Sequence, residues 1–358
     1  MIIPNPWLTN LLQGKTRQFV CDKTRINEIV HFRYPVFPEV TVDTQIVLLQ
    51  KGAPTPNWNA QVSIVAALPP GRDPSISGDS AKIQHQQAKW QRLNGGTINI
   101  FLHPEEEALA AKLLKGGKVL ADLCDINVGI KPYQTGKGTP PQTREIVEAR
   151  PFDSSEAITE LHRKYLRGSD IARYLIAPIE SRYLKFGRWL AEPRGAANFD
   201  SPEKLFMRQT GDSLVAALDT KQHLCLNNMH VLVPKAQAPQ ASYLLGVINS
   251  QLLNWYYQTL NPEIGEALAE VKRTNVARLP IRTLDLTKPD EKKQYDRMVQ
   301  LVEAMLSTQQ QLTTAANEND RAYYQSKAAG LDRQIDELTC DLYGLTAAER
   351  TLIQAPGT

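Results

Sequence analysis

The sequence of residues 206–233, FMRQTGDSLVAALDTKQHLCLNNMHVLV, alternates short apolar runs with polar turns. The turn Arg208–Asp212 contains a glycine, and Asn227-Asn228 separates two further apolar runs. Glycine, asparagine and aspartate are favoured in turns, and short apolar runs between turns are typical of strands. The same alternation extends over residues 119–240. It predicts an irregular, mainly β domain, whose boundaries we place at residues 119–285.

A helix is expected over residues 243–260, because apolar side chains recur there at three- and four-residue spacing. Asn261-Pro262 should end it, since proline cannot continue a helix. The side chains that define the pattern are Leu244, Leu245, Ile248, Leu252, Leu253 and Tyr256.

Two further apolar stripes predict an antiparallel helical hairpin at the C-terminus, over residues 286–358. The polar residues 315–320 lie between the stripes as a turn, which favours two helices packed side by side. The first stripe consists of Met298, Leu301, Val302, Met305 and Leu312, and the second of Leu331, Ile335, Leu338 and Leu342.

Residues 1–118 are expected to form a partial α/β domain. Met1–Ile3 resembles the start of a strand, and the near-continuous apolar run at residues 44–49 (TQIVLL) is typical of a buried strand. Residues 51–81 are rich in Pro, Gly, Ser and Asp, and we expect them to form a surface excursion. Residues 105–116 predict a short helix with acids in its first turn. The fold class is therefore predicted to be α+β.

The composition is that of a packed globular protein, with 42% hydrophobic and 22% charged residues in 358. No apolar run reaches the roughly 18 residues of a membrane span, and the N-terminus lacks a signal-peptide pattern. We expect no membrane association and a cytoplasmic location. The four cysteines form no CxxC pair and no cluster with histidine. Structural zinc is therefore not expected, and the thiols should be reduced.

The charge is concentrated in one stretch. The whole chain has a net charge of +3, but residues 162–194 contain eight Lys or Arg against three acids, a local charge of +5. Two interpretations are open. Cations and aromatic rings together suit a nucleic-acid backbone and base faces. Equally, the rings could face the core beneath a solvated basic surface, because Lys and Arg stems cover apolar atoms. The aromatic residues are Tyr165, Tyr174, Tyr183, Phe186 and Trp189.

No motif identifies a catalytic centre. A DNA methyltransferase acting on adenine needs a glycine loop for S-adenosylmethionine and an Asn/Asp-Pro-Pro-aromatic tetrapeptide, and Asn5-Pro6-Trp7 lacks the second proline. Asp290-Glu291-Lys292-Lys293 suits the first turn of a helix better than a Mg²⁺-dependent nuclease site. Gly136-Lys137-Gly138 is too short for a phosphate-binding P-loop. We expect a chain that is not catalytic alone and binds no cofactor itself.

Polar loops of the predicted β domain carry side chains suited to DNA. Glutamine can pair with adenine, and lysine can reach guanine or a phosphate. Several such loops on one domain are typical of a base-contacting surface. The candidates are Lys131, Gln134 and Lys137 in the first loop, Arg167 and Arg173 around a turn, Arg208 and Gln209 in the next turn, and Asn227.

The order of these segments resembles the C-terminal specificity domain of TaqI-like adenine-N6 DNA methyltransferases and type IIG restriction–modification enzymes. The resemblance covers most of residues 120–348, and its last segment, Ile335–Ala348, is similar to the helical tail of such enzymes. The other matching segments are Val128–Thr143, Leu166–Tyr174, Phe206–Val233 and Tyr243–Ile281.

Residues 1–50 resemble the end of the family's methyltransferase domain, whose catalytic motifs lie upstream and are absent from this sequence. A split enzyme, a gene fragment and a truncated chain are the three explanations. Alone, these residues would be edge pieces of a sheet that lacks its main strands, with unpaired backbone groups that invite a partner. Val36-Phe37-Pro38 resembles the segment whose aromatic ring stacks on a flipped-out adenine. The alternative for Phe37 is a core position beside a buried strand.

The resemblance implies sequence-specific recognition of duplex DNA that positions an adenine methyltransferase, with S-adenosylmethionine bound by the missing catalytic part. A separate methyltransferase or nuclease chain is an expected partner, and the recognised bases stay open. The alternatives are a complete methyltransferase or nuclease with unrecognised motifs, and a protein-interaction module. We expect phosphate contacts from Lys131, Lys137, Arg173, Arg182, Lys185 and Arg188. We expect base contacts from Gln134, Arg167, Arg208, Gln209 and Asn227.

Overall fold

The computed structural model describes residues 1–32, 36–37, 44–65, 80–92, 96–260 and 269–354. They form two compact units, Met1–Leu109 and Ala110–Thr358. Helices and sheets occur in both, which confirms the α+β class. The predicted boundary at residue 286 stays a prediction, because the segments on either side of it belong to the second unit.

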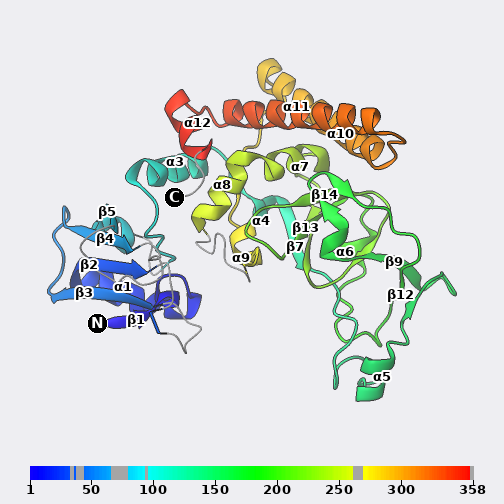
Figure 1. Ribbon diagram of the computed structural model, residues 1–358, viewed down its shortest axis with the longest axis horizontal. Coiled ribbons are helices and arrows are strands. Elements are labelled where there is room, and N and C mark those ends of the chain that lie inside the picture. The colour runs from blue at the N-terminus through cyan, green and yellow to red at the C-terminus, as the bar shows by residue number, and fades with distance from the viewer. Residues whose placement is uncertain (33–35, 38–43, 66–79, 93–95, 261–268, 355–358) are drawn as a thin grey trace. The chain divides into compact units, whose positions relative to one another are not determined.

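The first unit is built on a five-stranded sheet of order β1-β3-β2-β4-β5 (Figure 1). β2 pairs antiparallel with β3 and parallel with β4. The strands are β1 (Ile2–Pro4), β2 (Thr24–Phe32), β3 (Thr44–Lys51), β4 (Asn59–Val65) and β5 (Ser80–Gln86). The helices are α1 (Gly14–Lys23), α2 (Gln87–Gln91) and, continuing into the second unit, α3 (Pro104–Lys115), with the 3₁₀ turns η1 (Asn5–Leu8) and η2 (Leu11–Gln13).

One row of paired side chains forms the centre of this unit's core. Val47 of β3 pairs with Ile29 of β2, Ile29 with Val62 of β4, and Val62 with Ile83 of β5. All four are buried in one cluster, together with Trp90 of α2. β-Branched side chains on adjacent strands pack well against each other, which explains why these short runs form a sheet.

The structure differs in part from two expectations for this unit. β2 and β3 are interior strands, because β1 pairs with the outer side of β3 and β4 with that of β2, whereas β1 lies at the edge of the sheet as expected. β4 itself lies inside the predicted surface excursion of residues 51–81, and its Val62 is fully buried. The turn-forming residues flank a short strand there; residues 66–79 lie outside the described part. The helix expected at residues 105–116 is confirmed as α3.

The second unit contains two four-stranded sheets of short strands, with orders β14-β13-β16-β7 and β15-β9-β12-β8. Phe206 of β13 pairs with Ala217 of β14 and with Val231 of β16, and all three are buried. The first sheet consists of β7 (Cys124–Val128), β13 (Lys204–Arg208), β14 (Ala216–Asp219) and β16 (Met229–Pro234). The second consists of β8 (Asp153–Ser154), β9 (His162–Leu166), β12 (Tyr183–Lys185) and β15 (Leu224–Cys225).

Smaller elements connect these sheets. β10 (Ile171–Ala172) pairs with β11 (Leu175–Ile176), and β6 (Lys118–Val119) pairs with β17 (Pro280–Ile281). The short helices are α4 (Leu120–Leu123), α5 (Arg144–Ala149), α6 (Ala197–Asp200) and α9 (Arg273–Val276), with the 3₁₀ turn η3 (Gly168–Asp170).

The helix expected at residues 243–260 is two helices, α7 (Ala241–Asn249) and α8 (Gln251–Leu260), separated at Ser250. Ser250 has an extended backbone (φ −66°, ψ 152°). Its hydroxyl accepts a hydrogen bond from the Leu253 amide at 3.3 Å. A serine that bonds a nearby amide competes with helix continuation, so it ends α7 and caps α8. Asn261-Pro262, the predicted end, lies outside the described residues.

The helical hairpin is confirmed. It consists of α10 (Pro289–Thr313) and α11 (Glu318–Leu342), and α12 (Ala347–Gln354) follows (Figure 1). Asn317 begins α11, and its side-chain oxygen accepts from the Asp320 amide at 2.8 Å. α7 packs closely on α10, since a β-carbon at Gly246 would lie 2.6 Å from Met298 Sδ. None of the described helices is long and apolar enough to cross a membrane.

Candidate nucleic-acid interface

The loop that begins at Gly129 is tied to the turn containing Asn227. The Ile130 amide donates to the Cys225 carbonyl oxygen (2.8 Å), and the Asn227 amide donates to the Ile130 carbonyl oxygen (2.9 Å). A β-carbon at Gly129 would lie 2.1 Å from the Leu226 carbonyl oxygen, so only glycine permits this approach. Lys131 and Asn227, distant in the sequence, therefore come from directly connected segments.

Gln142 organises the rest of this loop. Its side chain is 3% exposed. Its Nε2 donates to the carbonyl oxygens of Pro132 and Trp189, both at 2.8 Å. Its Oε1 accepts from the Gln134 amide at 2.9 Å. The buried amide thus connects both halves of the loop to the segment that follows β12.

Lys137 and Arg188 are exposed on the two segments that Gln142 joins. The Thr139 amide donates to the Arg188 carbonyl oxygen at 2.8 Å. Gly138 has a φ of +89°, and a β-carbon there would lie 2.5 Å from the Trp189 carbonyl oxygen. Lys185 lies over the Trp189 ring, 5.2 Å from its centroid. Three cations predicted from the sequence, Lys137, Lys185 and Arg188, therefore lie on neighbouring backbone segments.

A second junction forms around Asn228. Its side-chain oxygen accepts from the Gly168 amide (3.3 Å), and its carbonyl oxygen accepts from the Gln209 amide (3.0 Å). Arg167 and Gln209 are thereby attached to the Asn227–Asn228 turn. Together with Lys131, the candidate base contacts Arg167, Gln209 and Asn227 come from loops joined by hydrogen bonds.

The end of β13 holds Arg208 and Gln209 in a partly buried position. Gln209 Nε2 donates to a carboxylate oxygen of Glu270, and the Thr210 backbone bridges to Glu270. Among the described residues, Arg208 Nε has no hydrogen-bond partner. The environment of Gln209 is therefore partly acidic, which its position in a polar turn did not reveal.

Several cations of residues 162–194 are engaged in ion pairs. Arg173 makes two hydrogen bonds to Asp332 of α11, at 2.8 and 2.9 Å, and donates to the Asn249 carbonyl oxygen at 2.6 Å. Arg182 pairs with Asp170. Arg173 and Arg182, both expected to hold phosphates, thus have carboxylate partners within the chain. The other pairs are Arg163–Asp200 and Arg194–Glu192.

The aromatic rings of the same stretch are also covered by its own cations. Arg182 lies over Tyr165, with 5.8 Å from guanidinium to ring centroid, and Arg173 lies 5.6 Å from the centroid of Tyr174. Tyr165 and Tyr174 are buried. Stacked cation–ring pairs are stabilising contacts. The interpretation of rings facing the core beneath a basic surface therefore describes much of this stretch.

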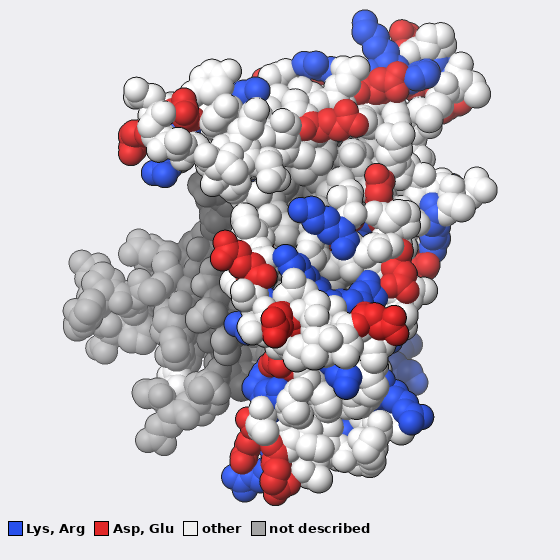
Figure 2. Space-filling model, turned by 90° about the vertical axis from the view of Figure 1, so that its right-hand side faces the viewer, with Lys and Arg blue, Asp and Glu red and all other residues white. Residues whose placement is uncertain are grey.

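Basic and acidic side chains are interspersed on one face of the molecule and do not form one continuous basic patch (Figure 2). Among the described residues, Lys137, Lys185 and Arg188 have no acidic partner within ion-pairing distance. A backbone contact on this chain would therefore depend on these individual cations.

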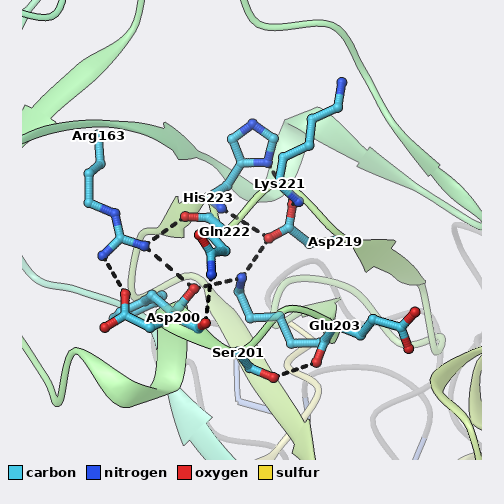
Figure 3. Close-up of polar contacts among 10 residues, drawn as sticks. Arg163, Asp200, Ser201, Glu203, Asp219, Lys221, Gln222 and His223 are labelled. Atoms are coloured by element: carbon cyan, nitrogen blue, oxygen red, sulfur yellow. Dashed lines mark hydrogen bonds and ion pairs between the residues drawn. The ribbon is translucent and has the colours of Figure 1, made fainter.

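A buried polar network lies at the other end of β13 and β14 (Figure 3). Lys204 Nζ donates to Asp219 Oδ2 at 2.6 Å and to the Phe199 carbonyl oxygen at 3.0 Å. His223 Nδ1 lies 2.6 Å from Asp219 Oδ1. Burial alone would raise the pKa of Asp219, but hydrogen bonds from His223 and Lys204 outweigh it and hold the pKa below its usual value. Both carboxylate oxygens of Asp219 are thus engaged within the chain.

Phe37 is 44% exposed, so the alternative interpretation, a core position, is wrong. Pro38 lies outside the described residues. Stacking of Phe37 on a flipped-out base stays a prediction.

S-adenosylmethionine would need a close glycine cradle after a strand. Gly52, which follows β3, has no atom within 4 Å of a built β-carbon, so it forms no such cradle. Within the described ranges, no group of three or more His, Cys, Asp or Glu could hold a metal ion. Gly52 is therefore not assigned to a cofactor site.

Sequence comparison identifies a family match and a curated relative. Residues 163–281 match the family model of the TaqI-like C-terminal specificity domain. A protein of Methanocaldococcus jannaschii, whose name assigns it to type II restriction enzymes and methyltransferases, is 23% identical over 358 residues. The match covers 96% of this chain and 27% of that relative.

Among solved structures, the type IIL restriction–modification enzyme MmeI, determined in complex with DNA, aligns with a TM-score of 0.51 at 12% identity. The alignment covers 100% of this chain and 47% of the MmeI chain. The fold is therefore shared with that enzyme, and this chain spans about half of its length. The type IIG restriction endonuclease BpuSI aligns over 96% of this chain with a TM-score of 0.35, which carries no argument about the fold.

Proposed function

We propose that this protein recognises a specific sequence in duplex DNA, because residues 163–281 match the family model of the TaqI-like C-terminal specificity domain. In this proposal it is the target-recognition part of a restriction–modification adenine methyltransferase. S-adenosylmethionine and the catalytic residues would belong to a methyltransferase or nuclease part outside residues 1–358.

One observation carries the proposal. Loops from four parts of the sequence, at Lys131, Arg167, Gln209 and Asn227, are attached to each other by backbone and side-chain hydrogen bonds. Loops fixed on a rigid sheet are the usual carriers of binding residues. A fixed set of polar loops could follow a groove of DNA, where base edges are distinguished by donor and acceptor pattern.

The roles divide by exposure and by engagement within the chain. Lys131, Lys137, Lys185 and Arg188 would bind phosphates. Arg173 and Arg182 are omitted from this group, because Asp332 and Asp170 hold them. The proposed base contacts are Gln134, Arg167, Arg208, Gln209 and Asn227, and Gln209 would exchange its hydrogen bond to Glu270 for one to a base.

The experiment measures binding of the purified chain to a random duplex pool across a range of salt concentrations, followed by selection of bound sequences. We expect enrichment of one sequence and affinity that falls steeply with salt, since cations on phosphates release counterions. Binding that shows neither enrichment nor salt dependence would contradict the proposal.

Two variants separate the roles. Arg188→Ala should weaken all duplexes alike and reduce the salt slope by about 1. Arg208→Ala should cost about 1–3 kcal/mol on the selected sequence and little on random DNA. Equal losses on both kinds of DNA would refute the base-contact role of Arg208.

The proposal that these residues are not catalytic alone has its own test. The purified chain is incubated with DNA and labelled S-adenosylmethionine, and separately with DNA and Mg²⁺. We expect neither methyl transfer nor cleavage. Turnover by this chain alone would establish the alternative of a complete enzyme.

A further inference from the structure

We propose that Gln142 is a positioning residue for binding the DNA backbone. Its buried amide holds the loop of residues 132–142 against the segment of residues 185–190, so that Lys137 and Arg188 are presented together to phosphates of one duplex. The inference rests on the proposed DNA-binding function and adds to it the residue that preorganises the phosphate contact.

The hydrogen bonds of Gln142 account for every polar atom it carries. The side chain bonds the Pro132 and Trp189 carbonyl oxygens and the Gln134 amide. Its backbone amide donates to the Lys137 carbonyl oxygen (2.7 Å), and its carbonyl oxygen accepts from the Gly136 amide (2.9 Å). A buried amide is costly when unpaired and rigidifying when fully paired. The loop is therefore held in this arrangement by the Gln142 side chain together with the Thr139–Arg188 backbone hydrogen bond.

The geometry places the two cations where a rigid loop is useful. Lys137 lies beside Gly138, whose backbone is tightly packed against the Trp189 carbonyl group, and Arg188 immediately precedes Trp189. Both side chains are exposed. Ordering a flexible loop during binding costs conformational entropy, so a loop that is already fixed binds more tightly with the same contacts. Phosphate is the ligand class that an ammonium and a guanidinium group together select.

The test is a thermodynamic cycle on the full chain, with a random-sequence duplex as the probe and the salt slope of binding as the readout. Gln142→Met keeps the side-chain volume and removes the three side-chain hydrogen bonds, while the backbone bonds stay possible. The double variant Lys137→Ala/Arg188→Ala removes the cations. We expect the double variant to lower the slope by about 2, Gln142→Met to lower it by most of the same amount, and the triple variant to lower it no further.

A second variant covers the case in which Gln142→Met does not fold. Gly138→Ala leaves Gln142 intact, but its β-carbon would lie 2.5 Å from the Trp189 carbonyl oxygen, so it should displace the loop from the same segment. We expect the same loss of slope. Gln300→Met, an exposed glutamine on α10, is the matched control and should leave the slope unchanged. Thermal unfolding of each variant identifies those that are folded.

The outcomes separate the two proposals. If the wild-type chain binds duplex DNA and folded Gln142→Met keeps the full slope, or if the cation substitutions still lower the slope fully in the Gln142→Met background, the positioning role is wrong while DNA binding stands. If the wild-type chain shows no salt-dependent binding, the proposed function itself fails.

Discussion

Lys204 and Asp219 are direct cross-strand partners in the β13–β14 hairpin, and their side chains form a fully buried ion pair of 2.6 Å. Such a pair contributes little net stability, but breaking it is costly, and it favours one register over others. A slip by one residue would separate the charges and turn Phe206 out of the core. β13 ends at Arg208, so the register that the pair favours also determines where the candidate base contacts lie.

Replacing one partner of this pair should be strongly destabilising. Lys204→Met leaves the Asp219 carboxylate buried without its main counter-charge, and we expect a loss of about 3–5 kcal/mol in the free energy of unfolding. Urea denaturation measures it. The double variant Lys204→Met/Asp219→Leu should recover much of the loss, and the exposed Lys221→Met should be neutral. A neutral Lys204→Met would show that the pair does not hold the hairpin.

Arg173 and Arg188 should respond in opposite ways when substituted. Arg173→Ala removes the contacts to Asp332 and Asn249, so we expect a loss of about 1 kcal/mol in stability with an unchanged salt slope of DNA binding. Arg188→Ala should reduce the slope and leave stability nearly unchanged. Urea denaturation and salt titration on both variants check the pair. If Arg173→Ala lowers the salt slope of DNA binding, this arginine does contact a phosphate.

Substitutions of the two adjacent asparagines, Asn227 and Asn228, should have different effects. Asn228→Ala removes the acceptor of the Gly168 amide, and we expect a loss of about 1–2 kcal/mol in stability. Discrimination at the base pair contacted by Arg167 should fall with it, because the turn of Arg167 loses this contact, whereas the Gln209 amide keeps its bond to the Asn228 backbone carbonyl oxygen. Asn227→Ala, at an exposed side chain, should leave stability unchanged and reduce discrimination at one base pair by about 1–3 kcal/mol. Selection from a random pool, combined with thermal unfolding, distinguishes them.

Asp336 should make the stability depend on pH. Burial raises its pKa to about 6, from an ordinary value of 3.8, while the hydrogen bond from the Gln251 amide (2.7 Å) opposes the shift. The folded protein therefore favours the neutral form, so this group contributes stability that grows as the pH falls through 6 toward 4 and is lost as the pH rises.

Asp336→Asn keeps the acceptor for Gln251 and removes the charge. We expect it to stabilise the protein at pH 7.5 by up to about 3 kcal/mol and to have little effect near pH 4.5. Urea denaturation at both values measures the difference. Asp341→Asn, at an exposed carboxylate on the same helix, serves as the control with a small effect at both. An equal gain in the free energy of unfolding at the two pH values would contradict the raised pKa of Asp336.

The parts of the fold with long periodic patterns could be predicted from the sequence. The hairpin of α10 and α11 followed from stripes such as Met298–Met305, because only one face of each helix is apolar. The break at Ser250 was missed, since a serine hydroxyl competes locally with a strong apolar period. β4 was missed because proline-rich turns surround a short strand whose partner, β2, is set by parallel pairing that no local pattern contains.

The candidate interface could be predicted residue by residue but not as an arrangement. Lys137 and Arg188 were identified as cations, yet the contact between their segments involves Gln142, whose polar side chain gave no sign of burial. Arg173 was expected to hold a phosphate. Its partner Asp332 lies far along the sequence on α11, so no local pattern indicated the ion pair. Charge composition reports which residues can bind an anion, and only the fold determines which of them already have a carboxylate beside them.

The four cysteines have a practical consequence. Cys21, Cys124, Cys225 and Cys340 are all buried and unpaired, and burial raises the pKa of each thiol. Thiols react as thiolates, so all four should resist alkylation in the native protein. A single cysteine introduced at an exposed loop position would then be the one site that a fluorophore or cross-linker labels, and each candidate loop can be followed on DNA without removing any natural cysteine.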